Sequence, residues 1–334
     1  MNHLHFVDKY GSFTMDKPEN VSYLYFPLAS ETGLKSSLTP NLGGDAKIDQ
    51  ETFLLEPVSA ENLHSNRGVR NFWLVDEDGQ AFSVSGASAR QEADRFTPAQ
   101  DDSRLTAGLM WQTVERTAQD LGLDTEVTAF CPRQDNVEIL CITVRNQQEQ
   151  PRWLTPIAAV PLYGRSADNI RDHRNVTSML HRIWTTENGV MVRPTMSFDE
   201  RGHRPNHKVY YVEGFGPEGQ KPEAFYPTVE SFLGEGGTYL HPRAVYEQYP
   251  GVKAGSRAEG REAMGAFRFP AITLAPGQEA HYVLLLGVED SEEAVNAIWD
   301  KYHSWEQVQA VLDETRSYCC LLYTSDAADE LDGV

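Results

Sequence analysis

The sequence has little positive charge for its size, and this limits the partners it can have. Lys and Arg together number 29 against 49 Asp and Glu, which gives a formal net charge of -20. A protein whose main partner is nucleic acid or an anionic membrane surface presents a basic stripe, and this composition argues against both classes. The charge balance instead suits a soluble protein that binds a neutral ligand.

Apolar runs and cysteines are also scarce. No run approaches the roughly 20 apolar residues that a membrane-spanning helix needs. Residues 1–11 (MNHLHFVDKYG) show neither the basic nor the apolar part of a secretory signal. Of the four cysteines, Cys131 and Cys141 lie in apolar, strand-like runs, and we expect buried thiols rather than a disulfide or a metal pair. These features together predict a cytoplasmic protein.

Motifs for metal, cofactor and nucleophile chemistry are missing from the sequence. It contains neither the phosphate-binding pattern GxxxxGK[ST] nor the nucleophile pattern GxSxG. His, Cys and carboxylate residues do not cluster at the spacing of metal ligands. We therefore expect neither a metal site nor a resident cofactor.

What the chain does contain is a long series of short strand-like segments. Its 334 residues are 40% hydrophobic, enough to bury a core in one large domain or two ordinary ones. Residues 125–131 and 137–145 alternate in polarity across a polar turn, and Asp78-Gly79 marks a hairpin between two apolar runs. Such strands recur over almost three hundred residues. The pattern predicts a mainly β protein built as a large antiparallel sandwich.

The pattern becomes helical after residue 290. Ser291, followed by two acidic residues and apolar residues at helical spacing, predicts a helix from 291 to 302. Ser304 predicts the start of a second helix, which should run from Trp305 to about Tyr318. The domain prediction is therefore a sandwich over 1–289 and a helical linker over 290–318.

The last residues have an unusual composition. Residues 319–334 (CCLLYTSDAADELDGV) read like the translation of a sequencing adapter, and we expect them to be non-native. A natural short acidic tail is the alternative.

The densest group of polar side chains lies in residues 156–182. An apolar strand over 157–162 leads into eleven residues rich in Arg, Asp, Asn and His, and a strand-like run over 176–183 follows. Unpaired charges are too costly to bury, so these side chains must form a paired network or line a polar surface. The candidate substrate-binding or interface residues are Arg165, Asp168, Asn169, Arg171, Asp172, His173 and Arg174. A purely structural network that pins the loop is the alternative.

Other candidates have simpler explanations. Residues 199–204 and the pair Asp101-Asp102 are expected to be solvated turns, and Glu292-Glu293 the first turn of a helix. His64 and Arg67, beside Asn62 and Asn66, could contact sugar hydroxyls but are more typical of a surface loop. Four tryptophans could stack on sugars, although in strands they are more often core residues. They are Trp73, Trp111, Trp153 and Trp184.

Four segments in this order resemble one enzyme family. They are residues 10–13 (YGSF), residues 164–174 (GRSADNIRDHR), the Pro276-Gly277 turn with its closing strand, and the helical pair after residue 290. Together they resemble the N-terminal part of glycoside hydrolase family 94, the cellobiose and cellodextrin phosphorylases formerly placed in glycosyltransferase family 36. The resemblance covers residues 6–318 and rests on segment order rather than on one decisive motif.

The resemblance implies an architecture and a reaction. Such enzymes carry a β super-sandwich, a helical linker, an (α/α) barrel and a small β domain. They cleave a β-glucoside with inorganic phosphate, invert the anomeric centre and release a sugar 1-phosphate. In such enzymes the catalytic acid belongs to the barrel, and we expect no barrel within this sequence. The resemblance therefore implies no catalytic residue here, phosphate as co-substrate, and a homodimer in which the sandwich lies near the partner's active site.

A freestanding sandwich that binds carbohydrate or serves structure, without catalysis, is the alternative. The helices after residue 290 discriminate between the two hypotheses. A linker to a further domain should leave an exposed apolar face, whereas a freestanding module should fold its helices back onto the sandwich.

Overall fold

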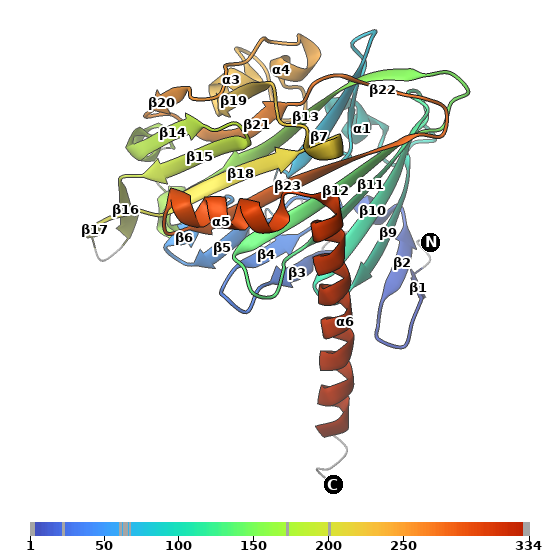
Figure 1. The fold of residues 1–334 in the computed structure, drawn as a ribbon, viewed down its shortest axis with the longest axis horizontal. Coiled ribbons are helices and arrows are strands. Elements are labelled where there is room, and N and C mark those ends of the chain that lie inside the picture. The colour runs from blue at the N-terminus through green and yellow to red at the C-terminus, as the bar shows by residue number, and fades with distance from the viewer. Residues whose placement is uncertain are drawn as a thin grey trace.

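The chain folds into a β-sandwich with helices on both of its outer faces (Figure 1). The computed structural model describes residues 4–21, 24–59, 62, 66, 68–171, 174–199 and 202–329. Within these residues every strand pair is antiparallel. The predicted fold class, a large antiparallel super-sandwich followed by helices, is confirmed.

The largest sheet has eleven strands in the described part of the chain. Their order is β1 (Leu4–Phe6), β2 (Phe13–Asp16), β9 (Asp102–Gly108), β10 (Trp111–Ala118), β11 (Leu123–Phe130), β12 (Val137–Asn146), β23 (Glu279–Glu289), β18 (Val209–Phe215), β15 (Gly189–Pro194), β14 (His181–Thr185) and β20 (Arg257–Glu259). The long closing strand β23 thus joins an N-terminal meander to the strands of the second half.

A second sheet packs against the first, and two smaller ones flank them. The second has the order β19 (Ala224–Thr228), β21 (Ala263–Arg268), β13 (Arg152–Leu162), β7 (Asn71–Asp76) and β8 (Ala81–Ser83), with β22 (Ile272–Leu274) also on β13. A four-stranded sheet contains β3 (Phe26–Ala29), β4 (Lys35–Leu38), β5 (Ala46–Asp49) and β6 (Thr52–Phe53). The hairpin β16 (Met196–Asp199) and β17 (Gly202–Pro205) stands apart.

The helices are mostly short. They are η1 (Pro18–Asn20), α1 (Ala89–Asp94), η2 (Ala167–Arg171), α2 (Arg174–Thr177), η3 (Ser178–Leu180), η4 (Pro217–Gly219), α3 (Val229–Leu233), α4 (Arg243–Tyr246), α5 (Glu292–Tyr302) and α6 (Trp305–Asp329). Figure 1 shows α5 lying along the large sheet and α6 running out from it.

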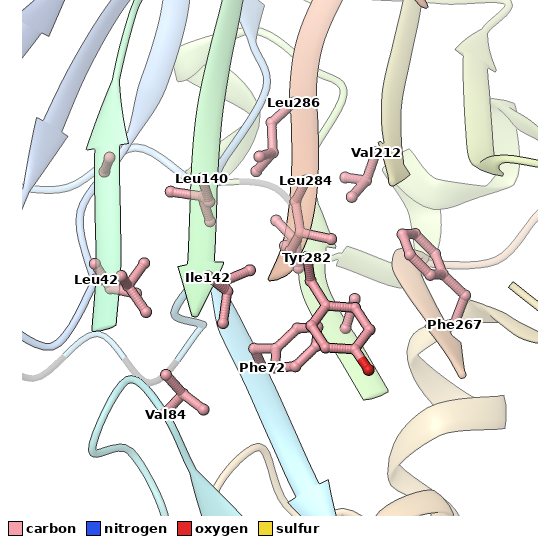
Figure 2. Close-up of a cluster of buried hydrophobic side chains, with 14 of the residues drawn as sticks. Leu42, Phe72, Val84, Leu140, Ile142, Val212, Phe267, Tyr282, Leu284 and Leu286 are labelled. Atoms are coloured by element: carbon pink, nitrogen blue, oxygen red, sulfur yellow. The ribbon is translucent and has the colours of Figure 1, made fainter. Parts of the chain in front are cut away.

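The central strands are apolar on both faces because both faces are covered. On β12, Leu140 and Ile142 point into the core between the sheets, while Ile139 and Cys141 point to the opposite face. Successive side chains of a strand alternate between faces, so a strand buried on both sides reads as one continuous apolar run. Figure 2 shows the inner set, where side chains from several strands meet around Tyr282.

Helices cover the outer faces. On the large sheet, Val295 and Ile298 of α5 and Val308 and Leu312 of α6 are buried in one apolar cluster with strand residues. On the second sheet, α3 and α4 cover a cluster that contains Trp73. The apolar faces of the predicted linker helices therefore lie against the sandwich, and the exposed apolar patch expected there is absent from the described residues.

Several local predictions can be compared with these elements. The meander over 125–145 and the hairpin at Asp78-Gly79 are confirmed as β11–β12 and β7–β8. Ser291 caps α5 by accepting a hydrogen bond from the amide of Ala294. The predicted end of the second helix near Tyr318 is wrong, because α6 continues to Asp329.

The two central cysteines are buried free thiols, as predicted. Cys131 and Cys141 form no disulfide. Burial raises the pKa of both thiols, because the interior disfavours the thiolate. They therefore serve as small apolar core residues. None of the described helices combines the length and apolar character needed to cross a membrane.

One ion pair is buried completely between the sheets. The Arg70 Nε and Nη2 atoms lie 2.5 and 3.0 Å from the two carboxylate oxygens of Glu138, and both side chains are fully buried. The Arg70 guanidinium also donates to the Ser36 hydroxyl and to the carbonyls of Leu42, Gly43 and Asp45. Arg70 directly precedes β7, Glu138 lies in β12, and the other partners belong to the four-stranded sheet or its turn. The pair therefore connects three sheets.

We expect Glu138→Ala to lower the free energy of unfolding by about 3–5 kcal/mol, because it leaves the Arg70 charge buried without a counterion. Urea unfolding measures this. Glu279→Ala is the matched control, since it removes the partner of the half-exposed Arg145 and should cost less than about 1 kcal/mol. Equal losses of unfolding free energy in the two variants would show that the buried ion pair stabilises the fold no more than an exposed one.

Candidate functional site

Arg165 is a buried anchor rather than a free ligand-binding group. Its side chain is 3% exposed. Nε donates to the Tyr163 carbonyl at 3.0 Å, Nη1 donates to the Thr177 hydroxyl at 2.6 Å, and Nη2 pairs with Glu262. The guanidinium carbon also lies 4.6 Å from the centre of the Tyr163 ring. Because one side chain joins β13, α2 and the start of β21, it fixes where the polar loop begins.

Backbone bonds tie the same loop to the four-stranded sheet. The Phe53 amide donates to the Arg165 carbonyl at 2.9 Å, and the Ala167 amide donates to the Gln50 carbonyl at 2.8 Å. Asn169 is buried and accepts a hydrogen bond from the Ser166 hydroxyl at 3.1 Å, which closes the turn. For Arg165 and Asn169 these contacts support the structural alternative, a paired network that pins a long connection.

The other loop candidates divide into two groups. Asp168 is half-buried at the start of η2. Asp172 and His173 lie outside the described residues, and of Arg171 and Arg174 only the backbone is described, at the end of η2 and the start of α2. Of the seven candidates, the side chains of Arg165, Asp168 and Asn169 are therefore the ones that the structure describes, and they lie in one short segment.

The strand predicted over 176–183 is confirmed only at its end, where residues 181–183 belong to β14. Its first part is helical, as α2 and η3, and β14 begins only at His181. Together with η2, these two helical pieces leave three large apolar side chains exposed, since Ile170, Val176 and Met179 are 45%, 61% and 64% accessible. β-branched and apolar composition favoured a strand, but the short connection from Arg165 to β14 is compact and helical instead.

A cleft of about 310 Å³ lies beside the Arg165 anchor. Its wall includes the ring of Tyr163 and the carboxylate of Glu262, the two groups that also contact Arg165. The rest of the lining comes from distant segments: Glu56, Asn62, Asn66, Gly68, Pro161, Leu162, Val229, Tyr239 and Ala263. Carboxylate, amide and aromatic groups of this kind can hydrogen-bond and stack on a sugar.

Sequence reasoning found only part of this cleft. Asn62 and Asn66 were named beside His64 and Arg67, and both asparagines do line it. His64 and Arg67 lie outside the described residues. Glu262 and Tyr239 were missed, because they precede or follow strands far from residue 165 and carry no local motif.

His181, at the start of β14, is buried beneath this loop. Its Nδ1 lies 3.2 Å from the Arg261 carbonyl, whereas Nε2 has no hydrogen-bond partner among the described residues. Burial lowers the pKa of His181 to about 3, and the nearby positive charge of Arg165 acts in the same direction. The imidazole is therefore neutral at physiological pH.

The remaining predicted positions are mostly structural. Trp73 is a core residue, as expected, and Trp153 is partly exposed. Of residues 199–204, residue 199 ends β16 and residues 202–204 belong to β17, whereas 200 and 201 lie outside the described residues. Asp101 is not a solvated turn residue: it is partly buried beside Arg116. Burial raises the pKa of Asp101.

No group of three or more His, Cys, Asp or Glu side chains that could hold a metal ion occurs in the described part of the chain. The polar residues around Arg165 instead contact one another and the backbone. The arrangement can position a loop and offer hydrogen bonds to a hydroxylated ligand.

The sequence matches the family described as "Glycosyl hydrolase 94, supersandwich domain" over residues 46–305. The chain belongs to this family. The matched range begins with β5 and ends at the first residue of α6, so it includes the whole second sheet, nine of the eleven strands of the large sheet, the loop at Arg165 and α5. Strands β1 and β2 lie before the matched range. The carbohydrate-active family predicted from the order of sequence segments is thereby confirmed.

No curated protein matches the chain. Among solved structures, it resembles a bacterial glucoamylase complexed with acarbose, with 11% identity, a TM-score of 0.47, and coverage of 96% of this chain and 40% of that one. A putative aldose 1-epimerase from Escherichia coli K12 is 10% identical with a TM-score of 0.36, and the match covers 80% of this chain and 99% of that one. Heparinase III is 10% identical with a TM-score of 0.37, and the match covers 88% of this chain and 38% of that one. The chain thus spans less than half of the glucoamylase and of heparinase III.

A pH dependence of stability follows from His181. Its imidazole has a pKa near 6.5 in the unfolded chain, so below that pH the unfolded state takes up a proton that the folded state does not. The free energy of unfolding should fall by up to about 1.4 kcal/mol per pH unit between roughly pH 6.5 and 3.

The measurement is urea unfolding at pH 7 and pH 5. Wild-type protein should lose about 2 kcal/mol more between these two pH values than His181→Gln. His303→Gln, at an exposed position on the α5–α6 connection, is the control and should keep the wild-type pH dependence. Identical losses for wild type and His181→Gln would contradict the burial of a neutral imidazole.

Proposed function

We propose that this chain is the sandwich and linker part of an inverting glycoside phosphorylase that acts on β-glucosides. In the whole enzyme, inorganic phosphate would attack the anomeric carbon while a carboxylic acid of a barrel domain protonates the leaving oxygen, and a sugar 1-phosphate would be released. The family match over residues 46–305 carries the proposal. Phosphate is a co-substrate in it, with no resident cofactor, and the cytoplasm is the proposed compartment.

The sandwich would contribute position rather than chemistry. Residues 1–289 would form the scaffold and 290–318 the linker towards the barrel, with 319–334 as adapter-derived residues. The described residues around Arg165 support this role, because they pin a loop and line a cleft without a catalytic constellation. On this proposal the fragment alone has no phosphorylase activity.

The loop after Arg165 is proposed as a contact surface for a second subunit. Ile170, Val176 and Met179 expose apolar side chains within ten residues, next to the anchored turn. Exposed apolar side chains grouped in this way are typical of protein interfaces. In the proposed homodimer, this surface would contact the partner subunit near the mouth of its active site. The oligosaccharide substrate of the whole enzyme would enter the active site there.

The freestanding sandwich is the second candidate function, and one observation favours it. The apolar residues of α5 and of the first half of α6 are buried against the large sheet. A module without a further domain would fold its helices in this way. It would bind carbohydrate but carry out no phosphorolysis.

Reading the source DNA past the codon for Tyr318 by an adapter-free method separates the two functions. We expect the frame to continue into several hundred residues of paired helices. The protein expressed from that frame should release glucose 1-phosphate from cellobiose only when inorganic phosphate is present. A stop codon directly after the present tail, or hydrolysis without phosphate, would contradict the phosphorylase proposal.

The contact surface has its own test. Val176→Asp combined with Met179→Asp should convert a dimer into a monomer, because two charges would be buried without partners at the interface. Sedimentation or light scattering measures the mass. Leu109→Asp, at an exposed apolar position outside the loop, should leave the dimer intact. If wild-type protein is monomeric, or if both variants dissociate alike, the loop is not the interface.

A further inference from the structure

The outer face of the second sheet is covered by helices at one end only. α3 and α4 contact β19, β21 and β7, and they close the cluster that contains Trp73. β22 and the adjoining start of β13 lie beyond these helices (Figure 1). Between α4 and this open end lies a cleft of about 190 Å³, to which the proposed function assigns no role.

Trp153 forms part of the wall of this cleft. Three alternate residues of β13 line it, Trp153, Thr155 and Ile157, so the indole shares the outer face with the other two side chains. Ile157 belongs to the apolar cluster beneath the helices. The indole therefore continues that apolar surface beyond the helices, where 38% of Trp153 is accessible to solvent.

The other five tryptophans of the chain each pack against a ring or a guanidinium group. Trp73, Trp299 and Trp305 contact the rings of Tyr246, Phe215 and His281, and Trp111 and Trp184 contact the guanidinium groups of Arg316 and Arg193. Within the described part of the chain, no such group covers Trp153. Aromatic faces attract rings and cations, so an uncovered indole is a surface on which a ligand can stack.

A pair of opposite charges lies in the same lining. The Arg268 Nε atom donates to a Glu223 carboxylate oxygen at 3.0 Å, and both side chains line the cleft. A ligand can reach them, because 22% of the Arg268 side chain and 44% of the Glu223 side chain are accessible. The Glu223 amide also donates to the Arg268 carbonyl at 2.8 Å, which holds the two residues side by side. The pair offers donors and acceptors together without net charge.

Gln248 adds a side-chain amide to the lining. It follows the cap residue of α4 and has a φ of +49°, a left-handed conformation that helix ends usually assign to Gly or Asn. Its exposed side chain forms no hydrogen bond to the described residues. The end of the helix accounts for the backbone conformation but not for the choice of glutamine. A long, free amide at this position therefore indicates a role at the surface of the cleft.

These groups together select a neutral, hydroxylated ligand. Arg268 would repel a cation and Glu223 would repel an anion, so neither kind of ion gains net attraction from the pair. A sugar hydroxyl both donates and accepts, and it can use guanidinium, carboxylate and amide groups at once. A β-linked glucose ring carries its hydroxyls at the edge and C–H groups on both faces, so its flat side fits an indole.

From this arrangement we propose that the Trp153 cleft binds one ring of a β-linked glucose chain, with the indole against the face of the ring and Glu223, Arg268 and Gln248 at its hydroxyls. The volume of the cleft lies below the range of enclosed small-molecule pockets, which suits a ring held on an open platform. The choice of β-glucosides as ligand rests on the proposed function. The site itself is separate from phosphorolysis, because it holds the sugar without breaking a bond.

The test is a titration of the whole 334-residue chain with cellotetraose in phosphate-free buffer, followed by ligand-observed NMR. We expect saturable binding that weakens about tenfold in Trp153→Ala, equivalent to about 1.4 kcal/mol. Gln248→Ala should weaken it about threefold, because it removes one hydrogen-bonding group. Phe96→Ala is the matched control, since Phe96 is an aromatic residue that is 71% exposed and lies outside the lining.

Acrylamide quenching of tryptophan fluorescence gives a second measurement. Trp153 is the one tryptophan of the six that is exposed, so bound cellotetraose should protect wild-type fluorescence from quenching. The protection should disappear in Trp153→Phe, because the fluorophore under the sugar is then gone. Trp153→Phe keeps an aromatic ring on the strand, and it keeps the test valid if Trp153→Ala fails to fold.

The outcomes separate this proposal from the proposed function. No saturable binding of cellotetraose, binding unchanged by both Trp153→Ala and Gln248→Ala, or binding of a polyproline peptide in place of the sugar would overturn it. Failure of phosphorolysis in the extended protein, with cellotetraose binding intact, would reject the phosphorylase and leave this site in place. Phosphorolysis without any cellotetraose binding by the present chain would reject this site alone.

Discussion

The buried pair of Arg70 and Glu138 is the constraint on which the sandwich depends. One guanidinium neutralises a carboxylate of the large sheet and satisfies three backbone carbonyls and a hydroxyl around the four-stranded sheet. Charges buried this deeply are tolerated only when every partner is in place. The relative positions of the three sheets are therefore set by one polar contact within an apolar core.

Two clefts of the described residues lie beside these sheets. They lie side by side, share Asn66, and take their walls from turns and short helices between strands that are distant in sequence. In the first, Arg165 is fully used in fixing a loop. In the second, Arg116 is equally buried, and its Nε and Nη2 have no hydrogen-bond partner among the described residues.

The helices after the sandwich bury their apolar residues against the large sheet. Val295, Ile298, Val308 and Leu312 cover the outer face of β12, β18 and β23. Such coverage explains why these strands are apolar on both faces.

The sequence by itself determined the strand content, the capped helix at Ser291, the buried thiols and the family, because these depend on local alternation, caps and segment order. Tertiary structure decided the rest. The apolar run after residue 175 became helical because a short connection had to reach β14, and α6 passed the predicted end near Tyr318. Arg116, Glu262 and Asp101 acquired their environments only when distant turns met. No local pattern encodes such contacts, since each needs the sheets to be in register first.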